Sequence, residues 1–193
     1  MFYFGYGSNL SEAQMRTRCP SAVVVGRAWL PNHRLVFRGW SGGWGGAVAS
    51  IEPAEGCQVE GAVYEIRDEN DALWLDYHEG CPTVYRAERV RVRLDKHQRL
   101  RCWTYVKVAG AEGWPSARYA RQIADGLKAH GHTVATLAAA LTRIAPSPPR
   151  PTPPAPLQRA PSPWSRATTA PSDDLWGPPP PRSGASWWGN TGS

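Results

Sequence analysis

The segment RVRVRLDKHQRLRCWTYVKV, residues 89–108, decides how the rest of the chain is interpreted. Its first six residues alternate charged and apolar side chains, which is the two-residue period of a β-strand with one buried and one solvated face. Residues 95–98 interrupt the alternation, and residues 100–108 are again rich in β-branched and aromatic side chains. The segment therefore predicts two antiparallel strands joined as a hairpin.

Five further stretches upstream have strand composition. They are rich in Val, Ile or aromatic residues and are separated by Pro, Gly and Asn: residues 2–6, 22–29, 33–37, 47–51 and 59–66. The segment from Gly39 to Gly46, rich in Gly and Trp, is predicted to be a mobile loop. Together with the hairpin, about seven strands are expected.

Four helices are predicted from caps and apolar periodicity. They are expected from Ser11 to before Pro20, from Asp71 to about Glu79, from Ser116 through the stripe Tyr119, Ile123 and Leu127, and over the stripe Val134, Leu137, Leu141 and Ile144. Ser11 and Gln14 form a capping-box pattern, Asn70 is the expected cap of the second helix, and Gly80 its stop. Strands and helices do not alternate regularly, so the predicted fold is α+β: a small mixed, largely antiparallel β-barrel with peripheral helices.

The prolines divide the chain in two. Fourteen of the 19 prolines lie in residues 146–193, where they cannot donate backbone hydrogen bonds to a helix or sheet. We therefore expect one folded domain, residues 1–145, followed by a proline-rich disordered tail, residues 146–193. The four tryptophans of the tail, Trp164, Trp176, Trp187 and Trp188, leave open a proline-rich ligand for a partner domain beside the commoner solvated appendage.

Charge and cysteine usage narrow the classes of function. Of the net charge of +6, the tail contributes +2, from four arginines against two aspartates, so the folded part carries a mild +4 with no block of like charges. The four cysteines are far apart, with no C-x-x-C and no histidine pair at ligand spacing, so neither a metal site nor a cofactor is expected. No stretch of 18 apolar residues and no apolar leader is present, so we expect a cytoplasmic protein without membrane contact.

Five arginines alternate along the predicted hairpin: Arg89, Arg91, Arg93, Arg99 and Arg101. They could contact nucleic acid, but a solvated polar face is the commoner reason for such a pattern. We expect no nucleic-acid partner.

The first candidate for chemistry is Y-F-G-Y-G-S-N-L, residues 3–10, where a short strand runs into a helix start. Glycines let the backbone approach a ligand, and a helix start leaves N–H groups that can bind a carboxylate or an oxyanion. An ordinary turn capped by Ser8 or Asn9 is the alternative.

The second candidate is L-D-Y-H-E-G-C-P, residues 75–82. On a helix, Glu79 would stack on Leu75 and lie beside Asp76, at the negative end of the helix dipole. All three effects raise the pKa of Glu79, as suits a carboxyl group that takes and returns a proton near neutral pH. A surface glutamate at a fraying helix end is the alternative.

Together the two motifs resemble the gamma-glutamylcyclotransferase family. Further matches are Arg18-Cys19-Pro20-Ser21-Ala22, Gly45-Gly46-Ala47, Gly61-Ala62-Val63-Tyr64 and Pro115-Ser116-x-x-Tyr119, so that the resemblance covers about residues 2–130. It implies a small barrel-like mixed sheet with helices and a cofactor-free release of 5-oxoproline from gamma-glutamyl amides. The substrate's own α-amine attacks its γ-carbonyl carbon, so no enzyme nucleophile is needed.

The resemblance also implies site residues. Glu79 corresponds to the catalytic acid and base. The family's substrate-binding loop corresponds to Tyr3, Phe4, Gly5, Tyr6, Gly7, Ser8 and Asn9. This loop would bind either the α-carboxylate of the glutamyl moiety or the developing oxyanion. Tyr119 corresponds to a pocket tyrosine, although it also fits an apolar helix stripe. Tyr85 is a further pocket residue or a core residue.

Glutathione-specific relatives have a shorter loop, closer to Y-G-S-L, whereas this chain keeps Asn9, which favours a broader gamma-glutamyl amine or amino-acid substrate. One alternative is removal of a gamma-glutamyl protecting group from a specialised metabolite, with Trp40 and Trp44 in the outer pocket. Another is a non-catalytic binding module, against which the presence of Glu79 argues. The released amine, the oligomeric state and the role of the tail stay open.

Overall fold

The computed structural model of the chain describes residues 1–95 and 98–144. The predicted proline-rich tail, residues 146–193, lies outside the described residues, and so does the boundary expected at residue 145. Both therefore stay predictions.

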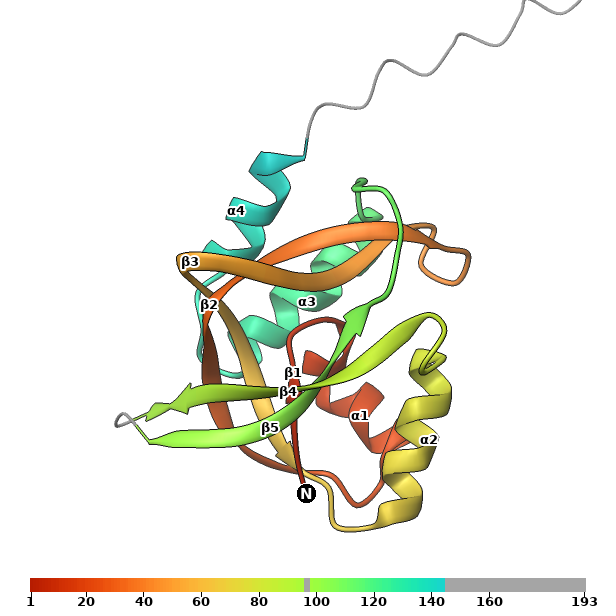
Figure 1. Ribbon diagram of the computed structural model, residues 1–193, viewed down its shortest axis with the longest axis vertical. Helices are drawn as coiled ribbons and strands as arrows, with labels where there is room; N and C mark the ends of the chain where they lie inside the picture. Colours follow the sequence, from red (N-terminus) through yellow and green to blue (C-terminus); the bar gives the residue numbers. More distant parts are fainter. Residues whose placement is uncertain (96–97, 145–193) are drawn as a thin grey trace, which may run out of the picture. The chain divides into compact units, whose positions relative to one another are not determined.

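Among the described residues, five strands close into a barrel in the order β1-β3-β2-β4-β5 (Figure 1). Their bounds are β1 Phe2–Gly5, β2 Val23–Ser41, β3 Gly46–Glu65, β4 Tyr85–Leu94 and β5 Arg99–Lys107. Neighbouring strands are antiparallel except β1 and β5, which pair in parallel at Tyr3 and Trp103. The predicted mixed, largely antiparallel barrel is confirmed.

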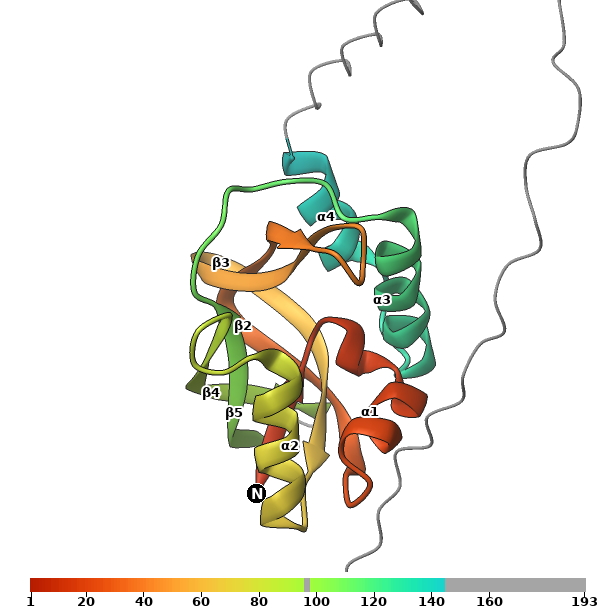
Figure 2. The ribbon, with the colours of Figure 1, turned by 90° about the vertical axis from the view of Figure 1, so that its right-hand side faces the viewer.

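In the part of the chain that the structure describes, four α-helices and one 3-10 turn surround the barrel. Their bounds are η1 Ser8–Leu10, α1 Glu12–Arg18, α2 Glu69–Glu79, α3 Ala117–Ala129 and α4 Ala135–Arg143. In both views α2 and α4 lie at opposite ends of the barrel. Figure 2 shows α1 beside α2 and the turn of η1 beside α3, in agreement with the contacts between these elements.

The strand count is where the sequence prediction was wrong. The stretches expected at 22–29 and 33–37 are one strand, β2, because Pro31 and Asn32 are absorbed as a register shift in which Asn32 adopts φ 56°. The stretches expected at 47–51 and 59–66 are likewise one strand, β3, which pairs with β2 along the same long hairpin. Strand β2 continues to Ser41, which pairs with Gly46, so the expected loop from Gly39 to Gly46 shrinks to a four-residue turn. Judged from the sequence alone, prolines and glycines are expected to end a strand. Within a long hairpin, however, a β-bulge can accommodate them.

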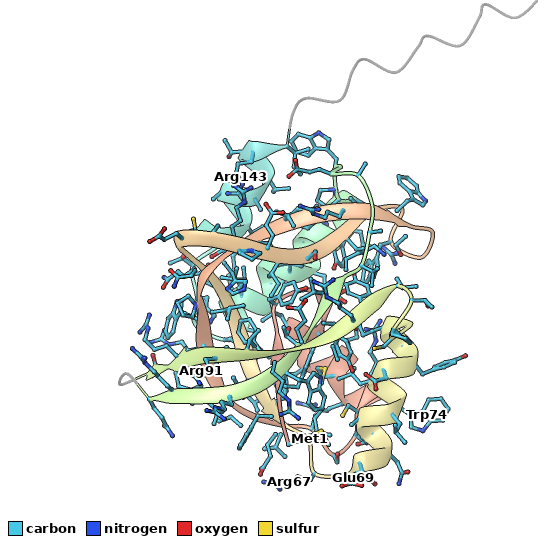
Figure 3. The ribbon with its side chains drawn as sticks, viewed as in Figure 1. Met1, Arg67, Glu69, Trp74, Arg91 and Arg143 are labelled. Carbon is cyan, nitrogen blue, oxygen red and sulfur yellow. The ribbon has the colours of Figure 1, made fainter. Side chains whose placement is uncertain are left out.

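The hairpin of β4 and β5 has the predicted alternation. Val90 and Val92 are buried in the barrel core, whereas Arg91 and Arg101 pair across the two strands on the exposed face. Figure 3 labels Arg91 on this hairpin. Arg93 lies with its guanidinium carbon 4.6 Å from the ring centroid of Trp29 on β2, so one of the five arginines packs on a neighbouring strand.

Helix α2 begins two residues earlier than expected. Asp68, and not Asn70, is its cap: Asp68 Oδ1 accepts a hydrogen bond from the Asn70 N–H at 2.9 Å. Its end agrees with the prediction, because Gly80 adopts a left-handed conformation with φ 62° and its N–H bonds back to the last turn. This stop makes Glu79 the last residue of the helix.

Helix α3 fixes the segment that follows β1. Its stripe of Tyr119, Ile123 and Leu127 is buried against the barrel, as predicted. On the same helix a Cβ placed at Gly126 would lie 2.5 Å from Leu10 Cβ. The helix backbone therefore contacts η1 directly, and this close approach holds the loop after β1 in place.

Candidate active site

A cavity of about 450 Å³ lies where the two sequence motifs meet. Eight of the residues expected at the site line it: Tyr3, Tyr6, Gly7, Ser8, Asn9, Glu79, Tyr85 and Tyr119. The loop after β1 and the end of α2 are far apart in the chain, but a hydrogen bond joins Asn9 to Glu79 across 70 residues. The barrel thus brings an acidic side chain to the glycine-containing loop.

Glu79 points its carboxylate at the loop. Its Oε1 accepts hydrogen bonds from Asn9 Nδ2 at 3.0 Å and from Arg18 Nη1 at 3.1 Å. Its side chain keeps only 13% of its surface exposed, and that of Arg18 keeps 20%. The carboxylate is therefore largely removed from water, held by two donors, and still part of the cavity wall.

Burial raises the pKa of Glu79 above its ordinary value, while Arg18, Asn9 and Lys107 each lower it. The net direction agrees with the prediction, whereas the predicted like charge, Asp76, is not among the influences on this pKa. The Asp76 carboxylate instead accepts a hydrogen bond from Tyr105 Oη at 2.6 Å. Loss of water around the carboxylate, which no local spacing reports, is the dominant cause.

Asn9 is the centre of a polar network. Its Nδ2 donates to Glu79 and to Tyr3 Oη at 2.8 Å, and its Oδ1 accepts from Gln14 Nε2 at 3.0 Å and Arg18 Nη1 at 2.9 Å. Both ends of the amide have two partners each, so the orientation of the buried Asn9 side chain is determined. The network couples the loop to the carboxylate.

Three side chains of this network were missed from the sequence: Gln14, Arg18 and Gln122. Ser11 Oγ accepts from the Gln14 N–H at 3.4 Å as a cap should. The Gln14 side chain, however, donates to Ser8 Oγ at 2.8 Å and accepts from Gln122 at 2.8 Å. The sequence did carry one indication that these side chains lie together, because Gln14 and Arg18 are four residues apart and so lie on one face of α1.

Tyr119 and Tyr85 both contact Ala49 on β3. Tyr119 Oη accepts from the Ala49 N–H at 3.1 Å, and Tyr85 Oη donates to the Ala49 carbonyl at 3.3 Å. Tyr119 is buried, and burial raises its pKa to about 12. Its ring packs near Phe37, and its hydroxyl borders the cavity beside Gly7. Its role toward a substrate stays a prediction.

Phe4 and Gly5 do not line the cavity, unlike the other loop residues expected to bind substrate. Phe4 is fully buried, and its carbonyl accepts from Thr104 Oγ1 at 2.7 Å. A Cβ at Gly61 would lie 2.5 Å from the Gly5 carbonyl and from the Phe4 ring. These two residues pack β1 closely against β3 and so position the loop from outside the cavity wall.

Within residues 1–95 and 98–144, no group of three or more His, Cys, Asp and Glu side chains could hold a metal ion. In the same part of the chain, no helix combines the length and the apolar character needed to cross a membrane.

Comparisons with known proteins agree with this geometry. The family model described as "Gamma-glutamyl cyclotransferase, AIG2-like" matches residues 3–126, which include both motifs. The mouse and human proteins named gamma-glutamylcyclotransferase are each 31% identical over 134 residues, covering 67% of this chain and 71% of theirs. A solved structure named gamma-glutamyl cyclotransferase superposes with a TM-score of 0.68 at 29% identity, covering 75% of this chain and 88% of that one. This chain belongs to the gamma-glutamyl cyclotransferase, AIG2-like family of enzymes.

Proposed function

We propose that the protein releases 5-oxoproline and a free amine or amino acid from gamma-glutamyl amides. The α-amine of the substrate forms a bond to its own γ-carbonyl carbon, the C–N bond of the amide breaks, and a five-membered lactam remains. The observation that carries the proposal is the meeting of Glu79 with the loop after β1 in one cavity. The names of the relatives support the same reaction.

The cavity wall suits a reaction in which the substrate must fold back on itself. Gly7 brings the loop backbone close to Tyr119, since a Cβ at Gly7 would lie 3.2 Å from the tyrosine hydroxyl oxygen. The loop backbone from Tyr6 to Asn9 holds the glutamyl moiety, through its α-carboxylate or the oxygen that becomes negative. Holding amine and carbonyl together recovers much of the entropic part of the barrier.

Glu79 carries the protons. The α-amine must lose a proton before or as it attacks, and the departing nitrogen must gain one, so one carboxyl group can make both transfers in turn. A pKa raised by burial brings the group closer to the working pH than that of an exposed glutamate. Asn9 and Arg18 both bind Oε1, which leaves Oε2 for the substrate nitrogen.

The decisive variant is Glu79→Gln, which keeps the shape of the side chain and removes proton transfer. With gamma-glutamyl-alanine as substrate, we expect formation of 5-oxoproline to fall by about 100-fold or more. Binding of 5-oxoproline, followed as a thermal shift, should persist. Glu12→Gln, which removes an exposed carboxylate paired with Arg16, is the matched control. Unchanged turnover in Glu79→Gln would refute the proposal. Binding without turnover by the wild type would instead identify a binding module.

A second comparison concerns substrate breadth. Asn9 favours a broad range of gamma-glutamyl substrates, and Trp40 and Trp44 stand in the outer cavity wall, where a larger leaving group would project. We expect release of 5-oxoproline from gamma-glutamyl-alanine and gamma-glutamyl-lysine as well as from glutathione. Release from glutathione alone would contradict the argument from Asn9. Rejection of all three, with turnover of a larger gamma-glutamyl amide, would favour removal of a protecting group.

A further inference from the structure

A second cavity, of about 600 Å³, lies between helix α2 and the β4–β5 hairpin. Both views show α2 beside this hairpin (Figures 1 and 2). The cavity wall includes Ala72 and Leu73 of α2, Trp103 of β5 and Phe2 of β1. It shares no lining residue with the candidate active site, so the proposed reaction gives this hollow no role.

The wall of this second cavity is largely apolar, and part of it is uncovered. Leu73 keeps 65% of its surface exposed although it lines the cavity. On the sheet side, Phe2 and Trp103 are half-buried, and the ring centroid of Trp103 lies 5.7 Å from that of Tyr3. A concave site of this volume has room for an apolar group, which would contact the helix and the sheet at once.

A row of exposed arginines begins at the cavity and continues along the hairpin. Arg89 and Arg101 line the cavity, and Arg91 and Arg99 follow toward the turn of the hairpin. From Trp103 to Arg99, the row covers about 13 Å of strand. In the described part of the chain, none of these four arginines forms an ion pair. We call these four residues the arginine row.

The positive charges of the arginine row face one another. Arg91 and Arg101 are directly opposite in the register of β4 and β5, where like charges are destabilising. Arg99 is opposite Arg93, whose guanidinium group packs on Trp29. A negatively charged partner would reduce this repulsion and accept charge-assisted hydrogen bonds. The row is therefore complementary to an anionic ligand.

Three carboxylates in the cavity wall restrict where the negative charges of such a ligand can lie. Asp76 accepts a hydrogen bond from Tyr105 Oη, and Glu88 pairs with Arg86 at 2.5 Å. Glu69 lies in the first turn of α2, where the helix dipole favours a negative side chain. These carboxylates repel a phosphate backbone laid through the cavity. The part of the ligand inside the cavity must therefore be apolar, with its negative charges over the arginine row.

These features discriminate between possible occupants. A membrane presents a plane of headgroups, which would meet the arginines but leave the cavity unfilled. A second copy of this chain in a two-fold contact would place the arginine row against itself. A peptide with an apolar side chain between acidic residues fills the cavity and pairs the arginines at the same time.

We propose that the cavity and the arginine row together bind an acidic segment of a partner protein, with an apolar side chain inserted between α2 and β5. Leu73 and Trp103 contact the apolar side chain. Arg89 and Arg101 bind the carboxylates nearest to it, and the rest of the arginine row pairs with carboxylates farther along the segment. Because the two cavities share no lining residue, the bound segment does not occupy the candidate active site.

Fluorescence anisotropy with labelled synthetic peptides tests the proposal on the full chain. The probe is the peptide E-E-D-E-L-L-D-E-E. One comparator replaces both leucines by serine, and the other replaces every acidic residue by its amide. We expect the wild type to bind the probe with a Kd of about 100 μM or tighter, and each comparator about 10-fold more weakly or worse, because each comparator lacks one of the two kinds of contact.

Variants locate the binding site on the chain. The double variant Arg89→Gln with Arg101→Gln should bind the probe about 10- to 100-fold more weakly. Leu73→Ser should weaken binding of the probe by about 10-fold and remove most of the preference for the probe over the serine comparator. Arg121→Gln, at an exposed position of α3, is the matched control and should bind the probe as the wild type does. Melting temperatures establish that each variant keeps the fold.

Each other outcome overturns the proposal. If the wild type does not bind the probe, or binds the probe and both comparators equally, the groove is not a site for an acidic segment with an apolar side chain. If poly(U) RNA or vesicles containing phosphatidylserine bind through Arg89 and Arg101 while the probe does not, the arginine row recognises phosphate groups. If the double variant binds the probe as tightly as the wild type does, the peptide binds elsewhere on the chain.

Discussion

Replacing Arg18 by methionine tests a residue of the site to which the sequence analysis assigned no role. A single nitrogen of Arg18, Nη1, donates both to Asn9 Oδ1 at 2.9 Å and to Glu79 Oε1 at 3.1 Å. Arg18 makes no contact with a substrate in the proposed mechanism, so it is a positioning residue. Methionine keeps the unbranched stem and removes both hydrogen bonds together with the charge.

The size of the effect follows from the two contacts. A hydrogen bond to a charged group contributes about 1.5–3 kcal/mol, and tenfold in rate corresponds to about 1.4 kcal/mol. Side-chain exposures of 20% and 13% let water replace part of the lost interaction. We therefore assume that the net loss equals one hydrogen bond to a charged group and not two. On this basis kcat/KM near neutral pH should fall by about 10- to 100-fold.

The pH profile separates positioning from folding. Arg18 is the largest of the influences that lower the pKa of Glu79, so its removal raises that pKa further. The ascending limb of kcat/KM, which requires the ionised carboxylate, should move to higher pH, and the deficit should shrink in alkaline buffer. Formation of 5-oxoproline measured across pH is the assay, with Arg16→Met on the exposed face of α1 as control. An equal deficit at every pH, or none, would refute the reasoning.

Two further predictions concern stability. Gly126→Ala should lower the free energy of unfolding in urea by about 1–2 kcal/mol, because its Cβ would lie 2.5 Å from Leu10 Cβ and overpacking outweighs the helix preference for alanine. Gly42→Ala, which has open space around it, is the control and should change this free energy little. A Gly126→Ala protein more stable than the wild type would contradict the packing argument. Because burial raises the pKa of Glu79 in the folded state, its contribution to stability is present at low pH and is lost as the pH rises through that pKa. The glutamine in Glu79→Gln does not titrate, so the melting temperature of this variant should exceed that of the wild type at about pH 8, and the difference should close toward about pH 4. A wild type with the higher melting temperature at about pH 8 would contradict the predicted direction of the pH dependence.

Much of the fold was predictable because it depends on neighbours in the chain. The hairpin of residues 89–108 follows from two-residue alternation, and α3 follows from its Ser116 cap and a stripe with four-residue spacing. Rules based on neighbouring residues failed at some element boundaries. Pro31 does not end β2, because a register shift in the long hairpin accommodates it. Asp68 begins α2 in place of Asn70, because either side chain can accept the N–H bond of a helix cap.

The sequence by itself determined the α+β character, the helix stops and the two motifs, including which carboxylate stands at the end of α2. Only the tertiary structure decided what surrounds that carboxylate. Arg18 and Asn9 reach Glu79 across 61 and 70 residues, and Lys107 turns toward the same cavity from β5. The physical reason is that periodicity and capping are properties of a single segment. Loss of water and the pairing of charges arise only when the closing barrel brings separate segments together.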